Sequence, residues 1–561
     1  MEEKATAPRK FNDWVKNPII EDYALRYAPK SFRRWSEFAV ANAALGGIAY
    51  LADFAIGGSI TLSFGFSNAL SAILAAAVII FLTGLPIAYY ASKYNVDMDL
   101  LTRGAGFGYY GSTLTSLIYA SFTFIYFALE GSVMSQAFNL FFGVPMWLSY
   151  AITAVMILPL VLFGMTFISK LQVWTQPLWL ALLVLPFIVV IFKDPAAFHH
   201  WTHFAGAGGQ SGFNVLMFGS AAGIVLSLIA QIGEQVDYLR FMPEKGPTNR
   251  GRWWWTVVLA GPGWVVLGAL KQIGGSVMAS LIDPQIGAIK ADQPIQMYSH
   301  VLSLWIPAGA MALTIATFFV VVSQIKINVT NAYSGSLSWS NFFSRIFHAH
   351  PGRVVWLFVN VAIALVLMEL GVFGFLNKIL GFYSNVGVAW IGAVVADLVI
   401  NKPLLKISPS YIEFKRAHLH NFNAVGFGSM VIASVISVFA FFGAFGPVLR
   451  DFSPFLSLAL ALVLSPVLAI ATRGKYYIAR QPGDIVSDRA ASGNPVADCI
   501  GCGYEYETHD MATCPFYQGS ICSLCCSLEK NCHDACKTGK AMIPDTPLQV
   551  APADLADEAD G

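Results

Sequence analysis

The residues best suited to chemistry are eight cysteines, which all lie in one short segment of a chain of 561 residues. Their spacing is Cys499-x2-Cys502-x11-Cys514-x7-Cys522-x2-Cys525-Cys526-x5-Cys532-x3-Cys536. Two CxxC pairs and four further thiols are what two closed tetrahedral zinc sites require, with His509 or His533 as substitute ligands. So short a segment cannot bury a stabilising core and would depend on bound metal. The spacing therefore predicts a metal-binding module at residues 499–540.

Zinc is the metal that these thiols predict first, and an iron–sulfur cluster stays open as the alternative, since cysteine thiolates bind both. Disulfides are disfavoured because the charge pattern described below places the segment in the reducing cytoplasm. An enzyme is not expected, because no nucleophile–base pair accompanies the thiols.

The rest of the chain has the composition of a membrane protein. Of all residues, 56% are hydrophobic and only 12% are charged, whereas a soluble domain carries about 25% charged residues. This composition excludes an ordinary cytosolic enzyme and a disordered chain. The 34 Lys and Arg residues are balanced by 33 Asp and Glu residues, so the basic excess of a nucleic-acid-binding protein is missing.

Apolar runs of roughly 20 residues, long enough to cross a bilayer, occur twelve times between residues 36 and 472. They lie at about 36–60, 69–90, 110–141, 144–166, 170–192, 213–235, 253–282, 303–329, 354–373, 375–400, 422–446 and 454–472. Because lipid offers no partner to backbone amides, these spans must be helices. Residues 1–35 precede them, 473–498 form a polar linker, and 541–561 form an acidic tail with too few apolar residues to fold.

The distribution of Lys and Arg predicts the orientation of the spans. With the N-terminus inside, 28 of the 34 basic residues fall on inner segments and only Lys193, Lys290 and Arg450 fall on outer loops. Inner loops of membrane proteins carry this excess. We therefore expect a multi-pass protein of the cytoplasmic membrane with both termini in the cytoplasm.

A few charged side chains interrupt the apolar spans. Asp53 in span 1, Glu130 in span 3, Lys326 in span 8 and Glu369 in span 9 each cost at least about 2.5–3.5 kcal/mol at mid-membrane depth. An ion pair between Asp53 and Lys326 would offset much of this cost. Such a pair either fixes helix register or stands in for a coupling cation beside a substrate cavity. We expect two further lysines to lie near span ends and reach the interface, namely Lys271 and Lys378.

Glycine and aromatic residues point to a site between the spans. Glycines interrupt spans 1 and 6, as in transporters built from inverted repeats with a midplane site, although glycine also serves close helix packing. In span 3, Tyr126 and Glu130 are four residues apart and share a helix face. An aromatic face beside a carboxylate suits a flat ring that forms hydrogen bonds.

Five short stretches resemble a known family, the nucleobase:cation symporters of the NCS1 type, which includes cytosine, purine, uracil, allantoin and hydantoin permeases. They are Arg34-Trp35, LLTRGAGFGYYGS at 100–112, VDYLRF at 236–241, NVTNAYSGSLSWSN at 328–341 and VADLVINK at 395–402. The resemblance implies an all-α membrane protein with two inverted five-helix repeats plus two extra helices. It also implies that Tyr126 stacks on the substrate ring, that Glu130 lies at the position of a hydrogen-bonding amide, and that Asn328 and Asn331 approach the substrate from span 8.

Several positions depart from the family pattern. Leu228 stands near the position of a second stacking aromatic, and Glu130 replaces an amide. The hydroxyl residues that bind sodium in sodium-coupled members align with Lys326 and Ile327. A lysine ammonium there would occupy the cation site unless it loses its proton. These departures predict proton-coupled or sodium-independent transport of a nucleobase or related small heterocycle, with Asp53 and Lys326 as the coupling residues.

The chain also resembles the permease-like half of certain bacterial sensor histidine kinases. The resemblance lies in EDYALRYAPKSFRRW at 21–35 and in the cysteine-rich segment at 510–537. It implies an alternative function, a membrane sensor that signals through its cysteine module to a kinase on a separate chain. No GxxxxGK[ST] phosphate loop occurs, so ATP-driven transport is not expected.

Overall fold

The computed structural model describes residues 33–209, 212–482, 489–491 and 494–537, together with 11, 15, 20, 22 and 24–31. The predicted acidic tail at 541–561 lies outside the described residues. Most of the described chain is α-helical, and five short strands follow the last long helix.

Within the described residues, nine helical segments are long and apolar enough to cross a bilayer. They are α4 (Phe66–Tyr94), α6 (Gly111–Phe142), α9 (Gly164–Lys193), α11–η2–α12 (Val215–Leu239), α13–α14 (Arg250–Ile286), α17 (Gly309–Phe347), η3–α19–η4 (Val372–Asn401), η5–α20 (Ala424–Phe441) and α22 (Ser453–Thr472). Three further segments are shorter or interrupted. They are α2 (Glu37–Gly46) with α3 (Ala52–Phe64), α7 with α8 (Met146–Leu162), and α18 (Arg353–Glu369). Each of the twelve predicted spans therefore coincides with a helical segment.

Spans 1 and 6 are both interrupted near the middle. In span 1, α2 ends at Gly46 and α3 starts at Ala52. In span 6, α11 (Val215–Val225) passes into a tighter 3₁₀ segment, η2 (Leu226–Gln231), before α12 (Ile232–Leu239). The backbone hydrogen bonds of a 3₁₀ segment have poorer geometry than those of an α-helix. Unwound backbone inside a membrane is tolerated only where protein or a cavity satisfies it.

Glycines allow α3 to pack directly against α14 (Trp264–Ile286). A Cβ at Gly57 would lie 1.9 Å from the Gln272 carbonyl oxygen, and one at Gly275 would lie 2.1 Å from the Phe54 carbonyl oxygen. No side chain fits at either position, because the two backbones touch. These glycines therefore serve close packing, which brings the polar residues of α14 up to the break in span 1.

The cysteine-rich segment forms a small module of two antiparallel sheets and a short helix. β1 (Arg489–Ala491), β2 (Asn494–Asp498) and β3 (Glu505–Glu507) form one sheet in that order, with Val496 opposite Glu507. β4 (Met511–Cys514) and β5 (Gly519–Cys522) form the other and lead into α23 (Ser523–Leu528). The first sheet begins at Arg489, inside the segment that the sequence analysis treats as a linker.

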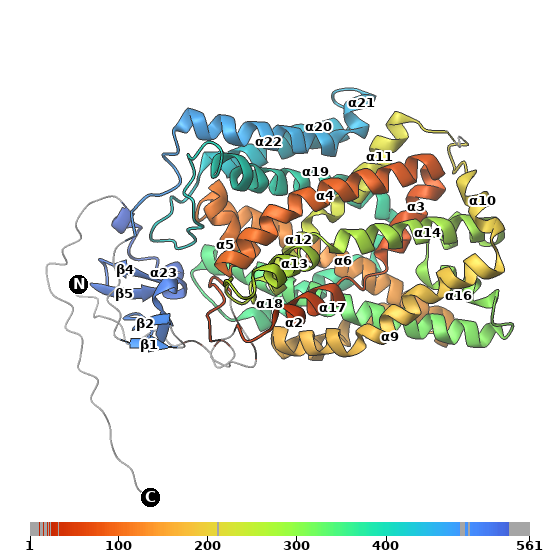
Figure 1. The fold of residues 1–561 in the computed structure, drawn as a ribbon, viewed down its shortest axis with the longest axis horizontal. Coiled ribbons are helices and arrows are strands. Elements are labelled where there is room, and N and C mark those ends of the chain that lie inside the picture. Colours follow the sequence, from red (N-terminus) through yellow and green to blue (C-terminus); the bar gives the residue numbers. More distant parts are fainter. Residues whose placement is uncertain are drawn as a thin grey trace, which may run out of the picture.

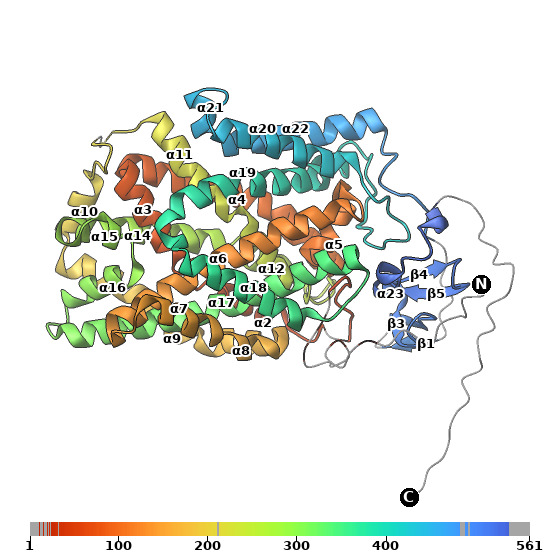
Figure 2. The same cartoon turned by 180° about the vertical axis from the view of Figure 1, so that it is seen from behind.

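The module lies at one end of the helical bundle, beyond the ends of the long helices (Figures 1 and 2). The N-terminal segment fastens it there. Arg26 forms a salt bridge with Asp510 at 3.1 Å, and the Tyr27 hydroxyl donates a hydrogen bond to Glu507. The backbone N–H of Lys30 donates to the same carboxylate at 2.7 Å. The two short helices α10 (Ala196–Thr202) and α16 (Pro294–Ser303) lie at the opposite end of the bundle (Figure 1).

Candidate transport site and metal centre

The break in span 1 exposes backbone carbonyls that a lysine side chain satisfies. The ammonium of Lys271, on α14, donates to the carbonyl oxygens of Ile48 and Tyr50 at 2.7 and 2.8 Å. It also lies 3.0 Å from a carboxylate oxygen of Asp53 and 3.7 Å from the centre of the Tyr50 ring. Carbonyl and carboxylate oxygens around one positive charge are the ligands that a bound alkali cation would have. The lysine thus supplies a cation that belongs to the chain itself.

The predicted ion pair between Asp53 and Lys326 is wrong, because the salt-bridge partner of Asp53 is Lys271. The second oxygen of Asp53 accepts a hydrogen bond from Gln272 at 2.7 Å, so α14 supplies both contacts. Lys271 was also expected near a span end, whereas its side chain is only 2% exposed. The close glycine packing of α3 on α14 explains the difference, since it places the two side chains against each other.

Lys326 lies instead between α17 and α9. Its ammonium donates to the Gln172 carbonyl oxygen at 3.0 Å and to the Thr175 hydroxyl at 2.8 Å. The Gln172 side chain returns a hydrogen bond to the Lys326 carbonyl at 2.7 Å. Both acceptors of the ammonium are neutral, so this lysine joins two helices without the carboxylate partner that Lys271 has.

Glu130, predicted as a substrate ligand on α6, caps the second half of span 1. Its carboxylate accepts hydrogen bonds at 3.1 Å from the backbone N–H groups of Leu51 and Ala52, at the start of α3. Gln324 on α17 donates a third at 2.6 Å. A negative charge at a helix N-terminus is favourable because unpaired N–H groups and the helix dipole both point at it. Glu130 therefore holds α3 against α6 and α17 at the midpoint of the bundle.

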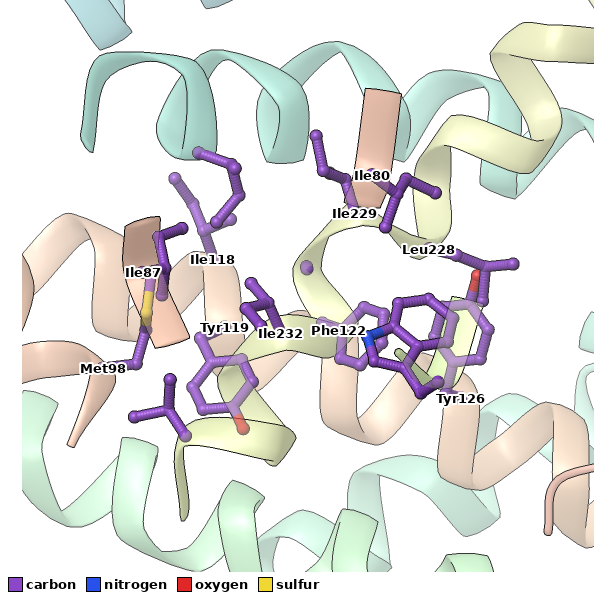
Figure 3. Close-up of a cluster of buried hydrophobic side chains, with 14 of the residues drawn as sticks. Ile80, Ile87, Met98, Ile118, Tyr119, Phe122, Tyr126, Leu228, Ile229 and Ile232 are labelled. Atoms are coloured by element: carbon purple, nitrogen blue, oxygen red, sulfur yellow. The ribbon is translucent and has the colours of Figure 1, made fainter. Parts of the chain in front are cut away.

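Tyr126 faces the break in span 6. Its hydroxyl lies 2.9 Å from the Ser227 hydroxyl in η2, and its ring packs on Phe122 with centroids 4.4 Å apart. Figure 3 shows these rings on α6 beside Leu228 and Ile229 of η2. Leu228, which the sequence predicts near the position of a second stacking aromatic, is buried.

Asn328 and Asn331, the other two predicted substrate ligands, lie on the face of α17 that contacts α6. The Asn331 amide donates to the Asn328 side-chain oxygen at 3.2 Å, and Asn328 donates to the Phe127 carbonyl at 3.5 Å. Both asparagines are fully buried. The structure thus brings all four predicted substrate ligands to the interface between α6 and its neighbours, α17 and the two broken spans.

Further buried polar side chains, beyond those predicted from the sequence, lie on α12 and α17. Within the described part of the chain, several buried oxygen and nitrogen atoms there have no hydrogen-bond partner. They are Oδ1 of Asn331, Oε1 of Gln324, Oε1 of Glu234, and both side-chain polar atoms of Gln235. Buried polar groups are nearly always paired, so these atoms are donors and acceptors that a polar ligand could satisfy. The signal was present in span 6, where AQIGEQVD interrupts an apolar run.

Two other charged residues singled out from the sequence lie outside this site. Glu369 is the last residue of α18 and is exposed, which contradicts the expectation of a mid-membrane charge. Lys378, in the first turn of α19 (Leu376–Ala396), is exposed and fits its predicted place near a span end.

Four of the eight cysteines form a compact, buried group. The Sγ atoms of Cys499, Cys502, Cys522 and Cys525 all lie within 4.8 Å of one another. A tetrahedral ion with bonds of about 2.3 Å to sulfur needs thiols about 3.8 Å apart, so small rotations would complete this geometry. The backbone N–H of Cys522 donates to the Cys499 sulfur at 3.2 Å, which suits a negatively charged ligand. A buried four-cysteine group therefore fits a single metal ion.

The two predicted substitute ligands are not part of this group. His509 packs edge-on against Tyr27, with ring centroids 4.9 Å apart, and also contacts Phe414. Among the described residues, the compact group consists of four cysteines, and His533 is not part of it.

Comparison with known proteins agrees with this geometry. Residues 27–413 match a family model described as a permease for cytosine/purines, uracil, thiamine and allantoin. None of the curated proteins matches the chain by sequence.

Among solved structures, the chain is similar to Mhp1, a nucleobase-cation-symport-1 family transporter. In the closed conformation with bromovinylhydantoin bound, the identity is 17% and the TM-score is 0.58, covering 81% of this chain and 99% of Mhp1. The inward-facing conformation of Mhp1 gives 18% and 0.55, covering 85% and 99%. A Na⁺-coupled sialic acid symporter in an outward-open state gives 13% and 0.51, covering 82% and 94%.

These similarities confirm the predicted fold class, an all-α membrane protein with two inverted five-helix repeats plus two further helices. The breaks in spans 1 and 6 and the family match over most of the membrane region lead to one assignment. The chain belongs to the family of permeases for cytosine and purines, uracil, thiamine and allantoin.

Proposed function

We propose that this protein is a secondary transporter that moves a nucleobase or related small heterocycle across the cytoplasmic membrane without sodium. The observation that carries the proposal is the position of Lys271. Its ammonium holds two carbonyl oxygens of the break in span 1 and the Asp53 carboxylate. A free cation would have to displace the Lys271 ammonium, which is part of the chain, from the same oxygens.

The substrate is proposed to bind between the breaks in spans 1 and 6. Tyr126 offers an aromatic face, and the orphan oxygens of Asn331, Gln324 and Glu234 offer acceptors for ring N–H and amino groups. Asn328 orients Asn331 through their shared hydrogen bond. A flat ring with several donors satisfies such a set, which is why a heterocycle fits better than a sugar or an aliphatic acid.

Proton coupling follows from the same pair. When the pair loses a proton, Lys271 becomes a neutral amine, and when the pair gains one, Asp53 becomes neutral and the ammonium loses its counter-charge. Either change alters the hold of Lys271 on the carbonyls of Ile48 and Tyr50. The break in span 1 would then shift with the proton. Lys326 is retained as a second candidate for this role, since it too is buried in a span.

Uptake into proteoliposomes tests this proposal. A labelled panel of cytosine, uracil, hypoxanthine and allantoin is offered under a proton gradient, a sodium gradient or neither. We expect saturable uptake of one compound that a proton gradient drives and a sodium gradient does not. Sodium-driven uptake would overturn the sodium-independent mechanism.

Two matched lysine variants assign the coupling residue. Lys271→Met should abolish gradient-driven uptake while substrate exchange continues, and exchange shows that the variant is folded. Lys326→Met removes a buried lysine with neutral partners and should keep driven uptake. The opposite result for the two variants would assign coupling to Lys326.

A second function, that of a membrane sensor, is favoured by the docking of the cysteine module on the bundle. The N-terminal segment before span 1 holds the module through Arg26 and Tyr27. A movement of span 1 on ligand binding would therefore reach the module, which we expect in the cytoplasm from the excess of Lys and Arg on the inner segments. Binding of a panel compound without flux, in the same proteoliposomes, would favour the sensor over the transporter.

A further inference from the structure

The four cysteines outside the compact group line one cavity of their own. Cys514, Cys526, Cys532 and Cys536 surround about 30 Å³ of free space together with Glu529, Asp534 and the apolar side chains of Phe516 and Ile521. Ala417, from the loop between spans 10 and 11, closes one side. The cavity thus lies at the joint between the module and the membrane domain. Its volume exceeds the 10–15 Å³ or so that one water needs.

Two sulfurs of this second quartet, those of Cys514 and Cys532, lie beside backbone N–H groups. Backbone N–H groups of Phe516 and Tyr517 point at the sulfur of Cys514, and the N–H of Asp534 points at that of Cys532. Such N–H···S bonds stabilise thiolate ligands of metals. Four thiols that converge on one cavity suit a metal centre, which displaces their protons on binding.

The two quartets differ in spacing. Among the described residues, the first quartet is the one group of three or more ligand side chains whose ligand atoms come within 4.8 Å of one another. The thiols of the second quartet stand farther apart around their cavity, although all four are described. A single ion would have to pull all four inward, whereas a multi-atom core can bridge wider gaps between cysteines.

We propose that Cys514, Cys526, Cys532 and Cys536 hold an iron–sulfur cluster, while the compact quartet holds a single zinc ion. The module would then contain two different metal centres, and the sequence alternatives of zinc and iron–sulfur would each apply to one quartet.

Arg416 and Lys537 connect the lining of the cavity to the membrane domain. The guanidinium of Arg416, in the same loop as Ala417, donates to the backbone carbonyls of Cys526 and Glu529 at 2.8 and 2.5 Å and pairs with Asp534 at 2.9 Å. Lys537 pairs with Asp534 at 3.2 Å and donates to Asn421 at 2.9 Å. Both cations therefore pair with Asp534 of the cavity lining, and both bridge the module to the membrane domain. Loss of the cluster would loosen this joint.

Metal and sulfide analysis of the full-length protein tests the proposal. After anaerobic purification in detergent, we expect zinc, iron and acid-labile sulfide in one preparation, together with the visible absorption of an iron–sulfur cluster. Two zinc ions without iron, or one metal without sulfide, would overturn the proposal.

Paired variants assign each metal to its quartet. Cys514→Ser with Cys532→Ser should remove the iron, the sulfide and the absorption and keep the zinc. Cys499→Ser with Cys525→Ser removes two ligands of the compact quartet and should remove the zinc, and the iron is then lost with it because the module unfolds without its zinc. Reconstitution with ferrous iron and sulfide should restore the absorption in the wild type but not in the first double variant. Iron retained by the first double variant would place the cluster elsewhere and overturn the assignment.

Discussion

The cysteine module and the break in span 1 each bring together polar groups that would be unfavourable if they were buried alone. The groups of the module are close together in the chain, whereas those at the break are far apart. The ligands of the compact metal site all lie between Cys499 and Cys525, in two CxxC segments. Lys271 and the carbonyl of Tyr50 are 221 residues apart and meet through the packing of α14 on α3. Spacing therefore predicts a local metal site well, whereas a buried charge only predicts that some partner exists.

The largest effect should come from removing the compact metal site. Structural zinc supplies apparent binding free energies of about 10–16 kcal/mol, which for a small module is its folding free energy. With Cys499→Ser and Cys525→Ser, the module should unfold while the helical bundle persists. Limited proteolysis of the purified protein would show rapid cleavage within residues 494–537 and a stable membrane fragment. A module that resists cleavage in this variant would show that it folds without the metal.

A smaller effect should follow from breaking the charge pair in the membrane. Lys271→Met leaves Asp53 buried without its partner, which costs about 3–5 kcal/mol. The midpoint of thermal unfolding in detergent should fall, and adding Asp53→Asn should restore most of it. Lys326→Met serves as the control, because its two acceptors are neutral and its loss leaves no buried charge. Equal destabilisation by the two lysine variants would contradict the prediction that Lys271, unlike Lys326, neutralises a buried carboxylate.

The smallest effect should come from weakening the cap on α3. Glu130→Gln keeps an acceptor oxygen but loses the charge at the helix N-terminus, which is worth about 1 kcal/mol. We expect about a fivefold loss of substrate affinity, measured by equilibrium binding to the purified protein, because α3 borders the proposed site. Glu369→Gln, at the exposed end of α18, should change nothing. Unchanged affinity in Glu130→Gln would show that the cap on α3 does not affect substrate binding.

Much of the membrane architecture could be predicted because its cause is local. Each span must bury its own backbone hydrogen bonds in a helix, so a run of apolar residues is sufficient evidence for it. The family resemblance then supplied the residues on α6 and α17, and the structure brings Tyr126, Glu130, Asn328 and Asn331 to one interface. Their roles toward a substrate remain a proposal.

The pairing of charges could not be predicted in the same way. Asp53 had two buried lysines as potential partners, and the sequence offers no measure of which helix packs against α3. Gly57 and Gly275 decide which lysine pairs with Asp53. Because neither glycine has a side chain, α14 packs close enough to α3 for Lys271 to reach the break in span 1. The polar residues Glu234 and Gln235 of span 6 could likewise be seen in the sequence, but the sequence did not tell which side chains surround them.

The amino-acid sequence by itself determined the number of spans, the family and a cysteine module with metal-binding spacing, since each depends on residues that are close together in the chain. Tertiary structure alone decided which lysine neutralises Asp53, that Glu130 caps α3, and that the eight cysteines divide into a compact and a wide quartet. The physical reason is that a charge or a thiol needs its partner within a few ångströms, and only helix packing and strand pairing set distances on that scale.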